Sequence, residues 1–308
     1  MRVLWGKIRE GLGIVKLKDC QTMSEKFWLV TTEHLKDGLW FQDEEDFKTG
    51  MSYVAVTNIL SGVGVMAFVL MSNHVHFVLG GSEDEAQFFI NHFKRFYSRY
   101  FHFKYSSTEL LRNNSINLRE LNIGDESFEK AVAYVHMNPV AANICSHPIG
   151  YPWGTGALFF SGSSIAGKRV DAFSKRSLYK ITHSKVAFPP EYIVDERGFV
   201  SPVSYVQKNF VESVFRSPKR MNFFLNNSSK AKYDAILPTF KDQSALAGMY
   251  DLCNSLFRKS SICDLTQEQK AELLKQMRYR FSADPKQLSR ITGLSQDSVM
   301  ELLDTFNA

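Results

Sequence analysis

Two histidines separated by a single residue are the clearest candidates for chemistry in this sequence. His74 and His76 lie in a short apolar run that is rich in Val and Phe and continues through Leu79, which is typical of a buried strand. Because side chains alternate between the faces of a strand, both imidazoles lie on one face, about 6.6 Å apart at ~3.3 Å per residue. Such a pair can bind one metal ion or act in catalysis. The structural alternative is two core histidines with ordinary hydrogen-bond partners.

The elements that would position these histidines follow the order strand, helix, strand, strand, helix. We expect a strand at 26–32, a helix that starts with the acids at 43–46 and ends near Gly62, a hairpin over 64–79 that turns at Ser72-Asn73, and a helix capped by Ser82 and Glu85. Acidic residues favour the positive end of the helix dipole, and Ser followed three residues later by Glu is a capping box. This order predicts an α+β protein in which helices cover a ferredoxin-like antiparallel sheet.

A further helix is predicted to begin near Ser127, after a polar stretch at 103–126 that we expect to be irregular. Tyr134 and Asn138 lie one turn apart on this helix. Pro139 lacks an N–H group and disfavours helical geometry before it, so we expect a kink or an end at Asn138. If the helix packs against the histidine strand, two imidazoles, an amide oxygen and a phenol meet at one point. A half-buried tyrosine and a helix stop are the structural alternatives.

Such a set of nitrogen and oxygen donors suits Mg²⁺ or Mn²⁺ and leaves positions for water or phosphate oxygens. The metal would polarise a scissile phosphate, and Tyr134 would serve as the nucleophile.

Two sequence motifs, in this order and spacing, resemble those of a known family. They are Met-Ser-Asn-His-Val-His at 71–76 and Tyr-Val-His-Met-Asn-Pro-Val at 134–140. Together they resemble the single-tyrosine HUH transposases, in particular the REP-associated tyrosine transposases. The resemblance covers roughly residues 23–160 and includes Tyr-Pro-Trp at 151–153, which is similar to the aromatic segment that closes the family's domain.

The resemblance implies a ferredoxin-like HUH endonuclease core and cleavage of single-stranded DNA that depends on a divalent metal, Mg²⁺ or Mn²⁺. It assigns metal binding to His74, His76 and Asn138, and it makes Tyr134 the nucleophile of a covalent 5′-phosphotyrosine intermediate. Family members often carry Pro where Ser72 stands, which concerns only the turn. The third metal ligand of the family is commonly an amide or an acid.

Basic and aromatic residues alternate along the helix that follows the hairpin. Lys94, Arg95 and Arg99 lie among phenylalanines and tyrosines. Basic side chains neutralise phosphates and aromatic rings stack on unpaired bases, so these three residues are predicted to bind single-stranded DNA. The structural alternative is a solvated basic face above an aromatic core stripe.

The chain is long enough for more than one domain. We expect an N-terminal extension at 1–22, the catalytic domain at 23–165, a linker rich in Ser, Gly and Lys at 166–190, and a mainly helical region at 191–308. The end of that region reads as helix, glycine turn and helix, which is similar to a helix-turn-helix. Its last helix carries Asp and Glu without Lys or Arg, so a packing role is the alternative to DNA contact.

Composition bounds the class of protein and its surroundings. The 308 residues are 44% hydrophobic and 22% charged, with a net charge of +5 that permits a polyanionic partner. The four cysteines form no CxxC pair, which fits a reducing cytoplasm and predicts neither a zinc site nor a disulfide framework. No apolar run is long enough to span a membrane, and charged residues near the N-terminus argue against a signal peptide. A monomer or homodimer is expected.

The leading hypothesis is therefore a transposase-type enzyme that nicks and joins single-stranded DNA, acting on hairpin ends. A relaxase or replication-initiator-like nicking enzyme with the same chemistry is one alternative. A catalytically silent DNA-binding regulator, which would need no tyrosine, is another.

Overall fold

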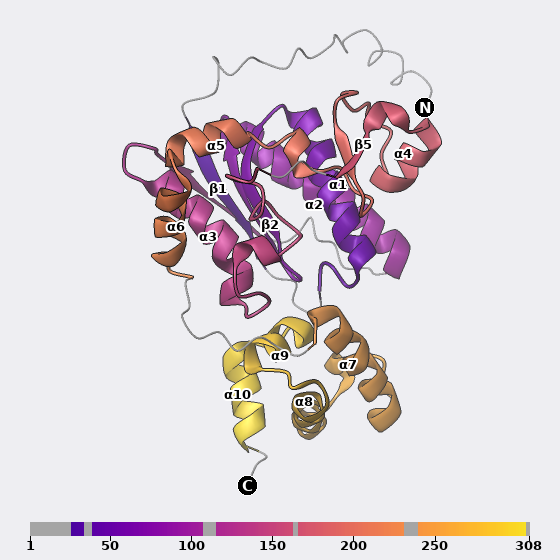
Figure 1. Ribbon diagram of the computed structural model, residues 1–308. Helices are drawn as coiled ribbons and strands as arrows, with labels where there is room; N and C mark the ends of the chain where they lie inside the picture. The colour runs from indigo at the N-terminus through magenta and orange to yellow at the C-terminus, as the bar shows by residue number, and fades with distance from the viewer. Residues whose placement is uncertain (1–25, 34–38, 107–114, 163–165, 231–239, 306–308) are drawn as a thin grey trace.

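A four-stranded antiparallel sheet lies at the centre of the protein. The computed structural model describes residues 26–33, 39–106, 115–162, 166–230 and 240–305, so the expected extension at 1–22 lies outside it. The strands are β1 (Phe27–Thr32), β2 (Gly64–Leu70), β3 (Val75–Gly80) and β4 (Ile116–Leu121), in the spatial order β2-β3-β1-β4. Helices α1 (Glu44–Ser61) and α2 (Glu83–Tyr105) complete a β-α-β-β-α-β order, which is ferredoxin-like in connectivity (Figure 1). The expected α+β class with an antiparallel sheet is confirmed.

The local signals in the sequence act as expected. Helix α2 begins with the expected capping box of Ser82 with Glu85, and the acidic start of α1 also forms one, of Asp43 with Asp46, that was not predicted. Helix α1 ends at Gly62, whose φ of 69° is readily available only to glycine. The backbone N–H of Met71 donates to the carbonyl of His74, which closes the hairpin around Ser72 and Asn73.

The two faces of the sheet are covered by different helices. Phe77 on β3 packs against Phe89 and Phe93 of α2, whereas its neighbour His76 faces Tyr134 of α3 (Ser127–Ala141). Helices α2 and α3 therefore lie on opposite faces, because adjacent residues of a strand point to opposite sides. Figure 1 shows α3 in front of the sheet and α1 with α2 behind and beside it. The histidine face of β3 is thus the α3 face.

Strand β4 corrects the expectation that residues 103–126 are irregular. Six of these residues pair with β1 in regular antiparallel register, from Ile116 opposite Thr32 to Leu121 opposite Phe27. The strand lies at the edge of the sheet and its side chains are mostly exposed or only partly buried. Because an edge strand needs few apolar residues, its polar composition concealed it.

Helix α3 corrects a second expectation, because it continues through Pro139 to Ala141. Proline removes the N–H that would bond the carbonyl of Val135, four residues earlier. Nδ2 of Asn138 donates to the carbonyl of Tyr134 at 2.8 Å and approaches that of Val135 at 3.5 Å. The Asn138 side chain thus adds a donor in the turn that Pro139 interrupts, mainly to the carbonyl next to the one that lost its partner, and the helix continues to Ala141.

The structure also differs from the expected linker at 166–190. This stretch contains β5 (Gly167–Arg169) and α4 (Lys175–Thr182), which packs against α1. It leads to β6 (Ile193–Asp195), α5 (Lys208–Phe215) and α6 (Pro218–Asn226), and apolar side chains as far as Leu225 share one core with the sheet. Helix α4 buries Leu178 and Ile181 in part between its polar residues, a short apolar pattern within a Ser- and Lys-rich composition. The division into domains stays a prediction.

A second apolar core lies in the C-terminal helices α7 (Asp242–Phe257), α8 (Gln267–Phe281), α9 (Pro285–Thr292) and α10 (Gln296–Thr305). These four helices, called the helical unit below, form a separate group in Figure 1. Helix α9 is capped by Asp284 and ends at Gly293, whose φ is 73°, and α10 follows. The expected helix, glycine turn and helix are confirmed as local structure. None of the helices that the structure describes is long and apolar enough to cross a lipid bilayer.

Candidate active site

The two histidines lie side by side at the start of β3. The centroids of their rings are 4.6 Å apart and the ring planes are nearly perpendicular, at 86°. His76 is 4% exposed, and His74 is partly exposed at the end of the hairpin turn. Nδ1 of His74 is hydrogen-bonded at 2.8 Å to Oδ1 of Asn73, and because that oxygen only accepts, the hydrogen belongs to Nδ1. The lone pair of the neutral His74 ring is then on Nε2, where a metal can bind.

Tyr134 reaches the histidines from α3 on the facing side of the sheet. Its ring centroid is 5.5 Å from that of His76, with the ring planes at 90°. Burial raises the pKa of the Tyr134 hydroxyl, and the Arg119 guanidinium on β4 partly opposes this. The phenol is therefore protonated at neutral pH and must lose its proton in order to act as a nucleophile.

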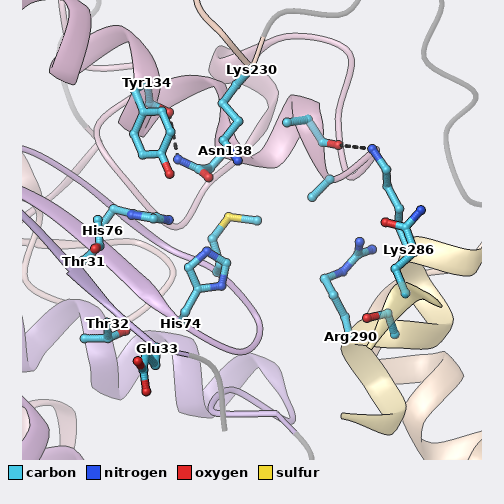
Figure 2. Close-up of a pocket in the computed structure, with 15 residues that line it drawn as sticks. Thr31, Thr32, Glu33, His74, His76, Tyr134, Asn138, Lys230, Lys286 and Arg290 are labelled. Atoms are coloured by element: carbon cyan, nitrogen blue, oxygen red, sulfur yellow. Dashed lines mark hydrogen bonds between the residues drawn. The ribbon is translucent and has the colours of Figure 1, made fainter. Parts of the chain in front are cut away.

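Asn138 lies one helical turn after Tyr134 and is almost fully buried. Its Nδ2 is bonded to the carbonyl of Tyr134, so the two ends of its amide have different surroundings. In Figure 2 the amide oxygen is directed toward the space between Tyr134, Lys230 and the histidines. The oxygen is thus the atom that Asn138 presents to the site.

All four residues line one cavity of about 520 Å³ (Figure 2). One wall consists of residues 31–33 at and just after the end of β1, His74 of the hairpin turn, His76 of β3 and the last two turns of α3. The sequence predicted that the histidine motif and the tyrosine motif meet, and the structure brings His74, His76, Tyr134 and Asn138 together. Their roles in metal binding and catalysis stay predictions.

The donors in this cavity fit a divalent cation that keeps open positions. They are two imidazole nitrogens and one amide oxygen, with the Glu33 carboxylate also on the lining. No group of three or more His, Cys, Asp and Glu side chains that could hold a metal ion occurs in the described part of the chain, so a metal bound here would need the amide of Asn138 as a third ligand. Imidazole and amide ligands are neutral, and anionic phosphate oxygens would complement them around Mg²⁺ or Mn²⁺.

The opposite wall of the cavity was not foreseen from the sequence. It is formed by Lys286, Ser289 and Arg290 of α9, with Gln296 of α10, whereas Lys230, just after α6, lies beside Tyr134. These residues come from segments more than 90 positions after Tyr134, and no motif connects them with it. The helix-turn-helix pattern located α9 but gave no sign of which surface α9 contacts.

None of the three basic residues predicted to bind DNA lines this cavity. Lys94 is 1% exposed, and burial lowers its pKa to about 8, with Glu33 opposing the change. Arg95 and Arg99 are exposed on α2. Helix α2 covers the face of the sheet opposite α3, so a strand bound at Tyr134 and one bound at Arg95 would lie on different sides. DNA binding by Arg95 and Arg99 stays a prediction.

Comparison with known proteins gives little beyond this geometry. No protein-family model matches the chain, and no curated protein matches it. A solved structure of a REP-associated tyrosine transposase bound to a REP hairpin is similar at 12% identity and a TM-score of 0.31, over 43% of this chain and 77% of that chain. A TM-score of 0.31 is too low to support a functional assignment.

Proposed function

We propose that this protein is a transposase-type enzyme with an HUH endonuclease core, which nicks and joins single-stranded DNA at hairpin ends through a covalent 5′-phosphotyrosine intermediate. The observation that carries the proposal is that Tyr134, His74, His76 and Asn138, from two separate motifs, line one cavity. Neither motif alone requires this. The close approach of the Tyr134 ring to His76 adds a nucleophile beside the candidate metal ligands.

The chemistry assigned to Tyr134 is a transesterification. The phenol oxygen attacks the phosphorus of a phosphodiester as its proton passes to water, a bond forms between phosphorus and the tyrosine oxygen, and the bond to the 3′ oxygen breaks. The 3′ oxygen takes up a proton and leaves as a hydroxyl. Attack of another 3′ hydroxyl on the phosphotyrosine reverses these steps and joins two strands. The exchange needs no external energy source, because one phosphodiester replaces another.

His74, His76 and Asn138 are the residues that would hold the divalent cation. When bound, it supplies electrophilic polarisation of the scissile phosphate. The hairpin turn and the helix fix these side chains before substrate arrives, which lowers the cost of ordering them. His76 is held by the pairing of β3 with both neighbouring strands, and Asn138 by its bond to the Tyr134 carbonyl.

The test is the formation of a covalent protein–DNA adduct. Wild type is incubated with Mn²⁺ and a pool of hairpin oligonucleotides whose single-stranded flanks are randomised, and denaturing gels detect a shifted protein band. We expect the adduct with wild type and with Tyr279→Phe, an exposed tyrosine outside the cavity, and no adduct with Tyr134→Phe. An adduct that persists in Tyr134→Phe would show that Tyr134 is not the nucleophile.

The same assay separates the alternatives. Transfer of the bound strand to a second 3′ hydroxyl supports a transposase-type enzyme, whereas nicking without transfer favours an initiator-like enzyme. DNA binding without any adduct favours a silent regulator. Calorimetry supplies a separate check of the metal site, because His76→Ala should bind Mn²⁺ more weakly than wild type. Equal affinity would make the histidines structural.

A further inference from the structure

The cavity is closed by residues from two cores that are far apart in the sequence. The sheet and α3 supply the candidate catalytic side chains, and α9 with α10 supplies the facing wall. A single strand bound at Tyr134 therefore lies against the helical unit as well. The helical unit thus lines the same cavity as the candidate catalytic side chains.

A buried network fixes α9 against the hairpin that carries the histidines. Asp242 accepts hydrogen bonds from Arg290 at 2.8 and 3.0 Å, from Gln287 at 3.2 Å and from Ser72 of the hairpin turn at 2.8 Å. Asp242 and Arg290 are both buried. A further bond at 3.0 Å joins Asn143, just beyond α3, to the N-cap Asp284 of α9. The facing wall is thus held at a fixed position relative to His74 and Tyr134.

Two lysines bring positive charge into this cavity. Nζ of Lys230 lies 5.2 Å from the centroid of the Tyr134 ring, and Nζ of Lys286 donates to the carbonyl of Ala141 at the end of α3, at 3.3 Å. Within the described residues, neither lysine is paired with a carboxylate. The charge of Arg290 is balanced by Asp242, whereas Lys230 and Lys286 have no carboxylate partner among the described residues and can pair with an anionic ligand.

We propose that Lys230 and Lys286 bind the phosphates of the DNA strand, Lys230 at the phosphate beside Tyr134 and Lys286 at a phosphate further along the strand. This rests on the proposed function, since it takes a single strand as the occupant of the cavity. An ammonium group is a point charge with three donors, so Lys286 can keep its bond to Ala141 and contact a phosphate oxygen as well. Such contacts follow the backbone and do not read bases.

The proposal also gives the helix-turn-helix a different contact surface. A recognition helix that reads DNA is usually the second helix of the motif. Here α10 is acidic at Asp297, Glu301 and Asp304, whereas α9 places Lys286 in the cavity. Strand binding therefore uses the start of the first helix.

The test measures DNA binding without metal, so it does not depend on cleavage. Fluorescence anisotropy follows a 5′-labelled (dT)20 strand in EDTA over a range of KCl concentrations. Each lost phosphate contact should lower, by about 0.7, the magnitude of the slope of the logarithm of the binding constant against the logarithm of the salt concentration. At 0.1 M salt this corresponds to about fivefold weaker binding. We expect this loss for Lys286→Gln and about twice the slope change for the double variant with Lys230→Gln.

Two variants control for folding and for general charge. Lys286→Arg keeps the positive charge and should keep the wild-type slope. Lys259→Gln removes an exposed charge of the helical unit outside the cavity and should also leave the slope unchanged. A Lys286→Gln slope equal to that of Lys259→Gln overturns the proposal, and so does a wild type that does not bind (dT)20.

Failure of this proposal and failure of the proposed function give different results. Normal adduct formation by wild type together with an unchanged salt slope in Lys286→Gln rejects only the proposal that Lys230 and Lys286 bind phosphates. A flatter salt slope in Lys286→Gln together with no adduct from wild type in Mn²⁺ supports phosphate binding by the lysines and rejects Tyr134 as the nucleophile.

Discussion

Asp242→Asn is the substitution that tests how firmly the helical unit is attached to the histidine hairpin. The Asp242 side chain is 3% exposed, and the side chain of its ion-pair partner Arg290 is 9% exposed. An asparagine keeps the shape but leaves the Arg290 charge buried without its counter-ion and weakens the bond from Ser72. Removing one partner of a buried pair costs about 3–5 kcal/mol. We expect a loss of this size in the free energy of unfolding or undocking of the helical unit.

The assay is urea denaturation followed by circular dichroism, with hydrogen exchange to locate the change. Exchange should speed up in α9 and in the hairpin turn at Ser72, and much less in α1. Asp171→Asn is the matched control, because Asp171 pairs with Arg169 at 2.7 Å on the exposed surface, where such pairs contribute about 0–1 kcal/mol. Equal losses for the two variants would refute the role given to Asp242.

The pH dependence of this attachment follows from the same contacts. Burial alone would raise the pKa of Asp242, but Arg290 and the hydrogen bonds from Ser72 and Gln287 more than offset it and hold the pKa below its usual value. A lowered pKa in the folded state gives stability that is present above the usual value of 3.8 and is lost as pH falls through the folded value. The attachment should therefore be constant near neutral pH and weaken only in strong acid.

Three further predictions concern α2 and the division into domains. Lys94→Met should raise the free energy of unfolding by up to about 3 kcal/mol at pH 7, because burial lowers the pKa of Lys94 from 10.5 to about 8. Urea titrations should show that this gain shrinks between pH 8 and 10.5. An equal gain at pH 7 and at pH 10.5 would contradict the prediction. Replacing Arg95 and Arg99 together by Gln should flatten the salt dependence of (dT)20 binding if α2 also binds the strand. An unchanged slope would mean that α2 presents a solvated basic face that does not bind DNA. A chain of residues 26–230 should fold with a cooperative melt, whereas 23–165 should expose apolar surface and bind a hydrophobic dye; equal melts of the two would contradict the shared core.

The parts of the fold that were predictable carry strong local signals. The capping box at Ser82, the acidic residues at 43–46, the apolar hairpin and the glycine at 62 each act within a few residues, so sequence order is enough to locate them. That His74 and His76 share one face, and that Tyr134 and Asn138 share one side of a helix, was predictable from the periods of strand and helix, whereas the meeting of Tyr134 with His76 was expected from the resemblance of the two motifs to a known family.

The parts that were missed depend on contacts that sequence order does not reveal. Strand β4 is specified by pairing with β1, and its polar residues look like a loop. The continuation of α3 through Pro139 is accompanied by a hydrogen bond from the Asn138 side chain to the Tyr134 carbonyl, which the sequence does not reveal. Lys230 reaches the cavity through the packing of α6 on α3, and Lys286 reaches it through the docking of α9, which a buried carboxylate from a third segment, Asp242, fixes.

The amide of Asn138 has two tasks that no other side chain of its size performs together. Its nitrogen donates to the carbonyl of Tyr134 in the turn where Pro139 removes a donor, and its oxygen faces the cavity. An aspartate would be the stronger ligand for a hard cation, yet it would set a carboxylate against a backbone carbonyl, two acceptors without a hydrogen between them. Under the proposed function, the identity of the third ligand is therefore set partly by the helix, because its nitrogen must also donate to the Tyr134 carbonyl. Exchanging Asn138 for an acid while keeping the proline would loosen the turn that aims Tyr134.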